Sequence, residues 1–311
     1  MNKECPTKSE EIKKRLCELN YPYACGKRCK RMFDRWYKQD EEIRKLHGED
    51  VIEKKTRRTK IEWTEATVNV ITGCSPISDG CKNCYAKAMH RRLTAMGIDK
   101  YKEPFYKVVC HDISSNLKKM IMKKTNMCFI NSMSDTFHKN VSDEYINKLL
   151  KELETYKGRT SFQLLTKRAE RIKDFSYPEN IWLGVTVEKS KYKDRIEHLK
   201  QTNAKVKFLS CEPLLSDLGE LNLQWIDWVI VGGESGANAR PMHPNWVRNI
   251  QRQCEEQNVA FFFKQWGEWK LNENPCYEFP YEFLWQRQPK ALLDGKEYKE
   301  FPKILYEEER K

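Results

Sequence analysis

Short apolar runs alternate with amphipathic stretches from residue 61 onward, and this alternation constrains the fold more than any other feature. Runs rich in β-branched, aliphatic and aromatic residues cover 67–72, 127–133, 161–166, 181–187, 206–211, 228–232 and 260–264. Helical periodicity lies between them, near 81–96, 143–156, 189–201 and 244–257. Strands that alternate with helices predict a parallel sheet covered by those helices.

The number of these units indicates a barrel. Six or seven strand–helix units within about 210 residues fit a partial or full (β/α) barrel better than a doubly wound sheet. No G-x-G-x-x-G sequence follows a predicted strand, so a dinucleotide-binding fold has no support. We therefore predict an α/β barrel domain over residues 59–270, followed by a C-terminal extension over residues 271–311.

Polar side chains follow nearly every predicted strand at its carboxyl end, which is where β/α barrels build their active sites. The candidates for binding a cofactor are Asn131, Ser132, Ser134, Asp135, Thr166, Lys167, Arg168, Glu188, Glu212, Gly233, Glu234 and Lys264. Seven such strand ends on one face favour a functional site over ordinary solvent exposure.

The expected roles follow from side-chain chemistry. Carboxylates suit an amine or ribose hydroxyls, and cations suit a carboxylate or phosphate. We expect Glu188, Glu212 and Glu234 to bind an amine or ribose hydroxyls. Lys167, Arg168 and the backbone after Gly233 are expected to bind a carboxylate or phosphate. Ser134 and Asp135 are expected to bind an amino group. Lys264 and Trp266 are expected to form a cation and a stacking face. This mixture of charges suits a ligand with an amino acid, a ribose and a base.

Three cysteines lie on one segment directly after the first predicted strand. Cys74, Cys81 and Cys84 have C-x6-C-x2-C spacing. Three thiolates can hold three corners of an iron–sulfur cube and leave the fourth iron open for a cosubstrate. A structural zinc site is usually closed by four ligands, and the nearest histidine, His90, lies more than a helical turn beyond Cys84. The spacing therefore favours a catalytic cluster.

Residues 1–58 read as a separate, small helical appendage. Residues 1–60 carry 18 Lys/Arg against 11 Asp/Glu, a net charge of +7. Four further thiols lie there, and their spacing matches no standard zinc finger. They are candidates for a second iron–sulfur or zinc site, against the alternative of unrelated thiols on two helices: Cys5, Cys17, Cys25 and Cys29.

Composition limits the cellular compartment and the kinds of binding partner that we expect for this protein. The chain has no apolar run near the roughly 18 residues of a membrane span, and its N-terminus lacks the apolar stretch of a signal peptide. We expect a cytoplasmic protein without a membrane partner, in which most of the twelve cysteines are reduced. Cys128 and Cys254 read as buried thiols. The net charge of +12 favours a polyanionic partner, with nucleic acid the default candidate.

Taken together, these segments resemble the phage-encoded three-cysteine-motif proteins, which are related to radical S-adenosylmethionine (SAM) enzymes. The most specific motifs are WVIVGGESG at 228–236 and FFFKQWG at 261–267. The resemblance spans about 60–270, through Trp63, 72–86, 129–138, 164–168, 182–188, 208–215, 228–246 and 261–269. The cysteine-bearing appendage and the residues past about 272 are not part of the common pattern.

The resemblance implies a radical SAM-type barrel with a 4Fe–4S cluster on Cys74, Cys81 and Cys84. SAM would bind the open iron, and an electron from an external donor would cleave it to a 5′-deoxyadenosyl radical. The usual radical SAM signature is C-x3-C-x2-C, and this chain has three more residues between its first two cysteines. Fold relatives include a lyase that repairs DNA thymines, so modification or repair of a nucleic-acid base or nucleotide is the expected reaction.

Two other functions remain open. A zinc-stabilised, basic nucleic-acid-binding protein would use all these thiols as structural ligands, with Cys110 or His111 completing the loop site from elsewhere in the fold. A sensor would hold a cluster without turning anything over.

Overall fold

The structure is a computed structural model that describes residues 59, 61–121, 125–158, 160–236, 238–272, 282–285 and 291–303. All of these belong to the second of the two units into which the chain divides, Arg58–Lys311. The predicted appendage and its candidate metal site at Cys5, Cys17, Cys25 and Cys29 lie outside the described residues. No helix within the described ranges is long and apolar enough to cross a membrane.

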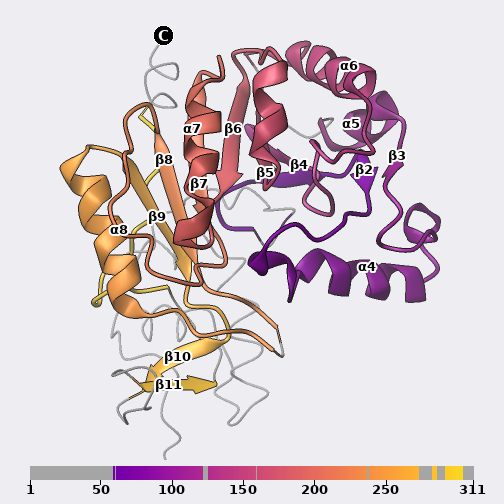
Figure 1. Cartoon of the computed structure of the whole chain (residues 1–311). Coiled ribbons are helices and arrows are strands. Elements are labelled where there is room, and N and C mark those ends of the chain that lie inside the picture. The colour runs from indigo at the N-terminus through magenta and orange to yellow at the C-terminus, as the bar shows by residue number, and fades with distance from the viewer. Residues whose placement is uncertain are drawn as a thin grey trace, which may run out of the picture. The chain divides into compact units, whose positions relative to one another are not determined.

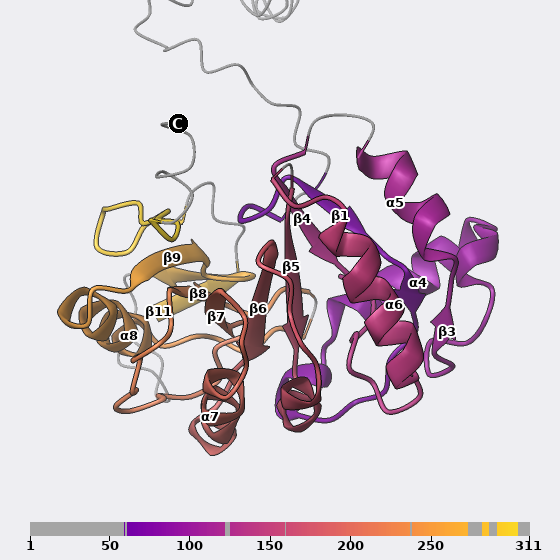
Figure 2. The ribbon, with the colours of Figure 1, turned by 90° about the horizontal axis from the view of Figure 1, so that it is seen from above.

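A seven-stranded, entirely parallel sheet forms the framework (Figure 1). Its strands are neighbours in chain order: β1 (Ala66–Val68), β4 (Met127–Ile130), β5 (Ser161–Thr166), β6 (Ile181–Thr186), β7 (Val206–Cys211), β8 (Trp228–Gly232) and β9 (Ala260–Gln265). Figure 2 shows them following one another around an arc. β9 does not pair with β1, so the sheet is an open half-barrel. This confirms the predicted partial α/β barrel.

Helices cover the convex face of the arc (Figure 2). They are α5 (Ile113–Ile121), α6 (Asp143–Glu154), α7 (Asp194–Lys200) and α8 (Pro244–Glu256). In α6, Ser142 accepts a hydrogen bond from the Tyr145 amide and caps the N-terminus. Ile146, Leu149, Leu150 and Leu153 then form a buried stripe at helical spacing. Such stripes pack against outward-facing strand residues in one large apolar core.

The concave face is filled at the amino ends of the strands by a second core, here called the aromatic cluster. Every residue of β6 is buried, as expected for a strand with both faces covered. Gly184 leaves space for the Phe208 ring, because a Cβ there would lie 2.4 Å from it. The members are Trp63, Met127, Phe129, Trp182, Val206, Phe208, Trp228, Ile230 and Phe262.

The first predicted strand is divided in two. β1 stays in the sheet, whereas β2 (Ile71–Thr72) leaves it and pairs antiparallel with β3 (Val109–Cys110). The Asn131 side-chain oxygen accepts hydrogen bonds from the amides of Val70 and Ile71, each at 2.9 Å, and fixes this change of direction. The prediction of one strand over 67–72 is therefore wrong, because a residue some sixty positions away pairs with the backbone at the bend.

Residues 291–303 pack on the barrel although the sequence places them in a C-terminal extension. Ala291 and Leu293 join the large core, and Phe301 packs on Trp228 with ring centroids 5.0 Å apart. The backbone of Lys299 forms an isolated antiparallel β-bridge with Phe262 of β9. A short hairpin, β10 (Trp269–Asn272) and β11 (Glu282–Trp285), lies between β9 and this segment in the chain. Cys128 and Cys254 are buried, as predicted.

Candidate functional site

The three clustered cysteines lie on residues 73–84, here called the cysteine loop. It follows β2, contains the short 3-10 helix η1 (Asp79–Cys81) and leads into α4 (Tyr85–Ala95). Cys74, Cys81 and Cys84 are all half-buried free thiols. The loop is held by side chains that follow the carboxyl ends of four strands of the sheet.

The first contact comes from the segment after β4. The Ser134 hydroxyl donates to the carbonyl of Gly73, and the two residues form an isolated parallel bridge. Gly73 has φ of 82°, and a Cβ there would lie 2.2 Å from the Lys107 carbonyl oxygen, so glycine is required where the loop begins. The residue before the first cysteine is thereby fixed on both sides.

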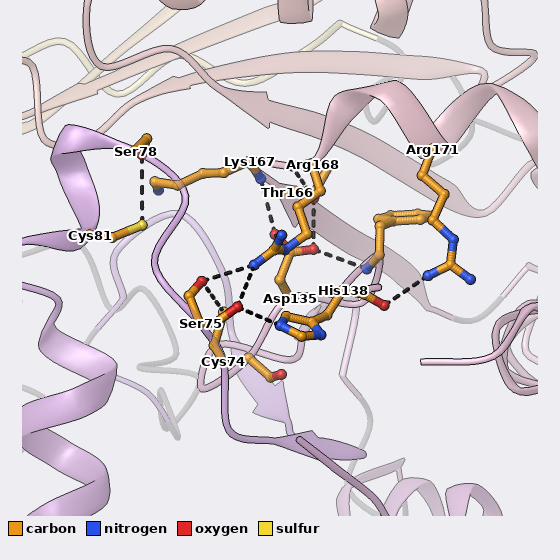
Figure 3. A network of polar contacts seen from close by, with 12 residues as sticks. Cys74, Ser75, Ser78, Cys81, Asp135, His138, Thr166, Lys167, Arg168 and Arg171 are labelled. Carbon is orange, nitrogen blue, oxygen red and sulfur yellow. Dashed lines mark hydrogen bonds and ion pairs between the residues drawn. The ribbon is translucent and has the colours of Figure 1, made fainter. Parts of the chain in front are cut away.

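The second contact is a polar network around Asp135, shown in Figure 3. Asp135 is buried and accepts hydrogen bonds from the Thr166 hydroxyl at 2.7 Å and from the Phe137 and Lys167 amides at 2.9 and 3.2 Å. Arg168 lies 3.9 Å from Asp135 and donates to the Ser75 carbonyl and hydroxyl at 2.9 and 3.1 Å. The strand-end charges thus hold the residue next to Cys74.

His138 completes that network from the other side. Its Nε2 lies 2.7 Å from the Ser75 hydroxyl, and its Nδ1 accepts a hydrogen bond from the Asn140 amide at 3.1 Å. Because Nδ1 is an acceptor, the neutral ring carries its proton on Nε2 and donates to Ser75. Burial and the nearby Arg168 charge lower the pKa of His138, which favours this neutral form.

The third contact is Glu188, after β6. Its carboxylate is fully buried and accepts from the Ser78 hydroxyl, the Gly80 amide at 3.4 Å and Arg195 at 2.8 Å. Arg195 also donates to the Thr186 carbonyl at 2.7 Å. Both members of this buried pair are therefore satisfied, and the pair holds the middle of the cysteine loop.

The fourth contact is Glu234, after β8. It accepts from Asn83 at 3.0 Å and from the Arg240 amide and Nε, each at 2.8 Å. Burial alone would raise the pKa of Glu234, but the hydrogen bonds from Arg240 and Asn83 outweigh it and leave that pKa below its usual value. Arg240 also donates to the Asp79 carbonyl at 3.0 Å. Glu234 therefore holds the loop between Cys81 and Cys84.

These contacts change the expected role of several strand-end residues. Asn131, Asp135, Thr166 and Glu188 are buried, and their polar atoms are used within the protein. In this structure these four residues, together with Ser134, Arg168 and Glu234, stabilise the cysteine loop or the backbone that leads to it. Sequence reasoning found the residues but not this task, because each contact joins positions far apart in the chain.

A cavity of about 610 Å³, here called the central cavity, lies beside the loop on the concave face. The aromatic cluster forms its floor through Trp63 and Phe129, and Cys84 and Tyr85 lie on its wall. Its volume is within the usual range for sites that bind small molecules. The predicted residues that line it are Ser132, Lys167, Glu212, Gly233, Glu234 and Lys264.

Charged groups face this cavity from three strands. Lys264 and Glu212 form an ion pair at 2.8 Å, and the Ser210 hydroxyl donates to Glu212 at 3.3 Å. A carboxylate can accept about four hydrogen bonds, so Glu212 keeps capacity for a ligand. Within the described part of the chain, no hydrogen bond or ion pair involves the Lys167 ammonium. Glu234 lines the cavity from a fourth strand, so the cavity combines one paired and one unpaired cation with two carboxylates.

One expectation at this edge is wrong. Trp266 is buried, packs on Phe263 and donates to the Leu292 carbonyl at 3.0 Å, so it offers no stacking face to a ligand. Gly233 is needed for packing of the chain itself, because a Cβ there would lie 2.0 Å from the Trp266 carbonyl oxygen. Its own amide donates to the Gln265 carbonyl at 2.8 Å, and the expectation that the backbone after Gly233 receives an anion stays a prediction.

The described residues of the cysteine loop hold no preformed site for a single metal ion. Within the described ranges, no group of three or more His, Cys, Asp or Glu side chains is placed to hold one metal ion. His90 is buried against Tyr101 and Phe105, and His111 contacts Thr72, so neither completes a zinc site. A cube binds each thiolate to a different iron, and its ligands are spread more widely than those of one ion.

The pKa of Cys74 bears on how a metal ion or cluster could bind to this thiol. Burial, with a contribution from the Asp135 charge, raises the pKa of Cys74 to about 11, so the uncoordinated thiol is protonated at neutral pH. Metal coordination stabilises the thiolate and would release this proton. A metal ion or cluster bound at Cys74 would therefore have to offset the burial that favours the protonated thiol.

Some residues of the site carried no sequence signal. Ser75 and Arg195 hold or complete the loop contacts, and Tyr192 accepts from the Asp79 amide at 3.1 Å and donates to its carboxylate at 2.9 Å. Tyr85 donates to the Ser132 carbonyl across the cavity wall. His138 did carry a signal, because its position three residues after Asp135 makes it the best pocket candidate among the histidines.

Comparisons with known proteins establish the family. The chain belongs to the family described as "Protein of unknown function (DUF5131)", which it matches over residues 58–302. No curated protein shows significant similarity to it. One solved structure, "Spore photoproduct lyase complexed with dinucleoside spore photoproduct", aligns over 74% of this chain and 72% of that chain, with 11% sequence identity and a TM-score of 0.36.

Proposed function

We propose that this member of the family is a radical SAM-type enzyme, with a 4Fe–4S cluster on Cys74, Cys81 and Cys84 and SAM in the central cavity. One observation carries the proposal: a loop with three half-buried thiols is anchored by four strand ends, and its last cysteine lines a cavity containing an unpaired ammonium. Anchoring of this kind holds cluster ligands at fixed separations and leaves room for a cosubstrate beside the third cysteine.

The residues that line the cavity can divide the recognition of SAM among them. Lys167 is the cation available to a carboxylate. Glu212, held by Lys264, retains acceptor capacity for an amine or ribose hydroxyls. The apolar floor at Trp63 and Phe129 suits a base and keeps water from the reacting atoms. Ser134, Asp135, Arg168, Glu188 and Glu234 would act as positioning residues that hold the loop.

The cofactors supply the hard chemistry. When bound, the cluster and SAM would provide a reductively generated 5′-deoxyadenosyl radical for hydrogen abstraction, with the electron from an external donor. We propose a nucleic-acid base or nucleotide as the substrate, supported by the net charge of +12.

The test is to purify the full chain without oxygen, reconstitute it with iron and sulfide, and measure iron and the visible spectrum. We expect about four irons per chain and a broad band near 400 nm. Both should be lost in the triple variant Cys74→Ala, Cys81→Ala, Cys84→Ala. The matched control is Cys110→Ala, which removes an exposed thiol outside the loop and should keep the full iron content.

A second measurement separates an enzyme from a sensor. With SAM and a strong reductant, the reconstituted protein should release 5′-deoxyadenosine, and Lys167→Ala should raise the SAM concentration needed. A colourless protein with bound zinc would refute the proposal and favour the nucleic-acid-binding alternative. About eight irons, with four surviving the triple variant, would place a second cluster on the cysteines of residues 1–58.

A further inference from the structure

A second hollow, of about 1200 Å³, runs along the exposed side of α4. Figure 1 shows α4 apart from the outer helices α6 and α8. We call this hollow the α4 groove. Ala86, His90 and Leu93 at helical spacing face inward against Tyr101, Met133 and Phe105. The other faces of the helix form the groove with residues of the segment 102–106.

The groove is cationic. Five lysines and arginines line it, against one carboxylate, Glu103, which is paired with Lys107 at 2.8 Å. The side chains of Lys82, Arg91 and Arg92 make no hydrogen bond or ion pair with any other described residue. Unpaired cations gathered along one hollow attract a polyanion. The five cations are Lys82, Lys87, Arg91, Arg92 and Lys102.

The groove is also rich in exposed aromatic and apolar side chains. Tyr85 and Tyr106 are 53% and 52% exposed, and Lys87 lies 5.0 Å from the centre of the Tyr106 ring. Three of the eight large apolar residues exposed in the described part of the chain line the groove: Tyr85, Met89 and Tyr106. Aromatic faces between cations are the usual surface for single-stranded nucleic acid.

The groove leads to the central cavity. Five residues line both hollows, among them Cys84, the last of the three clustered cysteines, and the aromatic Tyr85. Tyr85 donates a hydrogen bond to the Ser132 carbonyl, so its ring stands between the two spaces. A strand lying in the groove therefore needs to turn only one nucleotide inward, past Tyr85, to reach the cavity.

We infer that the α4 groove binds the backbone of a single-stranded nucleic acid and presents one base to the central cavity. The inference rests on the proposed function for the identity of the reacting site, but the binding surface stands on its own charge and aromatic content. Residues 1–60 are a poor occupant, because their net charge of +7 would be repelled by the cations of the groove.

The experiment measures binding of a fluorescent twelve-nucleotide DNA strand to the reconstituted full chain by anisotropy, over a range of salt. The test variant is Arg91→Glu, Arg92→Glu. We expect it to weaken binding at least about tenfold and to reduce the slope of log K against log salt by about 0.7 for each phosphate that the protein no longer neutralises. Tyr85→Ala should weaken binding by about fivefold or more, and Tyr85→Phe, which keeps the ring, by much less.

The matched control is Lys148→Glu, Lys151→Glu, which makes the same charge change on exposed positions of α6. Equal weakening by both pairs would overturn the inference, because it would show attraction by net charge only. Equal binding of the corresponding duplex would overturn the single-strand assignment. The RNA strand of the same sequence shows which sugar is preferred.

Binding and cluster chemistry can fail separately. The Arg91→Glu, Arg92→Glu variant should retain the iron content and the visible spectrum of the parent protein. Groove-dependent binding by a protein without iron would refute the proposed function and leave the inference standing. A protein with four irons and 5′-deoxyadenosine release, but no groove-dependent binding, would refute the inference alone.

Discussion

The two ends of the half-barrel are built from different interactions. At the amino ends of the strands, rings from five segments of the chain surround Trp228, and its indole nitrogen donates to the Glu300 carbonyl at 2.8 Å. At the carboxyl ends, carboxylates and cations hold the cysteine loop. Apolar packing is non-directional, whereas hydrogen-bonded pairs fix geometry. The difference indicates that one end provides stability and the other places the thiols.

Trp228→Ala should have the largest effect on stability. It tests whether the apolar end of the half-barrel stabilises the fold. The side chain is fully buried, and removing it leaves a large cavity among the rings. We expect a loss of about 4 kcal/mol in the free energy of unfolding, measured by urea denaturation. The control is Trp225→Ala, whose side chain is 71% exposed and whose loss should cost under about 0.5 kcal/mol. An equally small effect of both would show that the aromatic cluster does not stabilise the fold.

Glu188→Gln tests the polar end. It leaves Arg195 buried without its counter-charge and should cost about 3 kcal/mol. Unlike Trp228→Ala, it should also lower the iron retained by the folded fraction, because it weakens the contacts to Ser78 and Gly80. Glu179→Gln, on the surface pair with Lys157, is the control and should change stability by less than about 1 kcal/mol. Full iron retention in Glu188→Gln would separate loop anchoring from cluster binding.

Gly184→Ala should have an intermediate effect confined to the apolar end. Its new methyl group would meet the Phe208 ring at 2.4 Å, and overpacking of this kind costs about 1–3 kcal/mol. Iron content should not change. Adding Phe208→Leu should restore part of the lost stability, because the smaller side chain makes room for the methyl group. No rescue in the double variant would mean that the backbone, and not the ring, resists the substitution.

A change of pH should have the smallest effect on stability. It distinguishes the two ends, because the aromatic cluster contains no histidine whereas α4 buries His90. Burial lowers the pKa of His90 from 6.5. The unfolded chain therefore takes up this proton more readily, and the stability that the neutral ring allows is present above pH 6.5 and falls as the pH drops below it. His90→Phe should reduce the difference in unfolding free energy between about pH 7.5 and about pH 5. An unchanged difference would assign it to other groups.

The sequence predicted the sheet well because its signals are local. Buried parallel strands read as apolar runs, and the bounds of β5, β7 and β8 agree with the expected ranges. Helix α5 was missed because Ile113 and Leu117 are followed by a lysine pair and give a short stripe. The division of β1 from β2 depends on Asn131, which no window of neighbouring residues contains.

The sequence predicted which residues belong to the site better than it predicted how they are arranged. Glu188 and Glu234 stand where a barrel is expected to carry functional residues, yet their partners on the cysteine loop lie more than a hundred positions away. Trp266 read as a stacking residue because its burial depends on residues 291–303, where Leu292 accepts its hydrogen bond. Spacing along the chain carries no record of such distant contacts.

The segment 291–303 also affects how the molecule behaves toward its own copies. The Phe263 amide donates to the Tyr298 carbonyl at 2.9 Å, and the Glu300 amide donates to the Phe261 carbonyl at 3.2 Å, so β9 is paired on its outer side. Lys299 reaches further, to Glu62 at 2.6 Å and to the Phe263 carbonyl at 2.8 Å. An open barrel would otherwise present β9 as a bare template for strand addition, and this stretch protects that edge from aggregation.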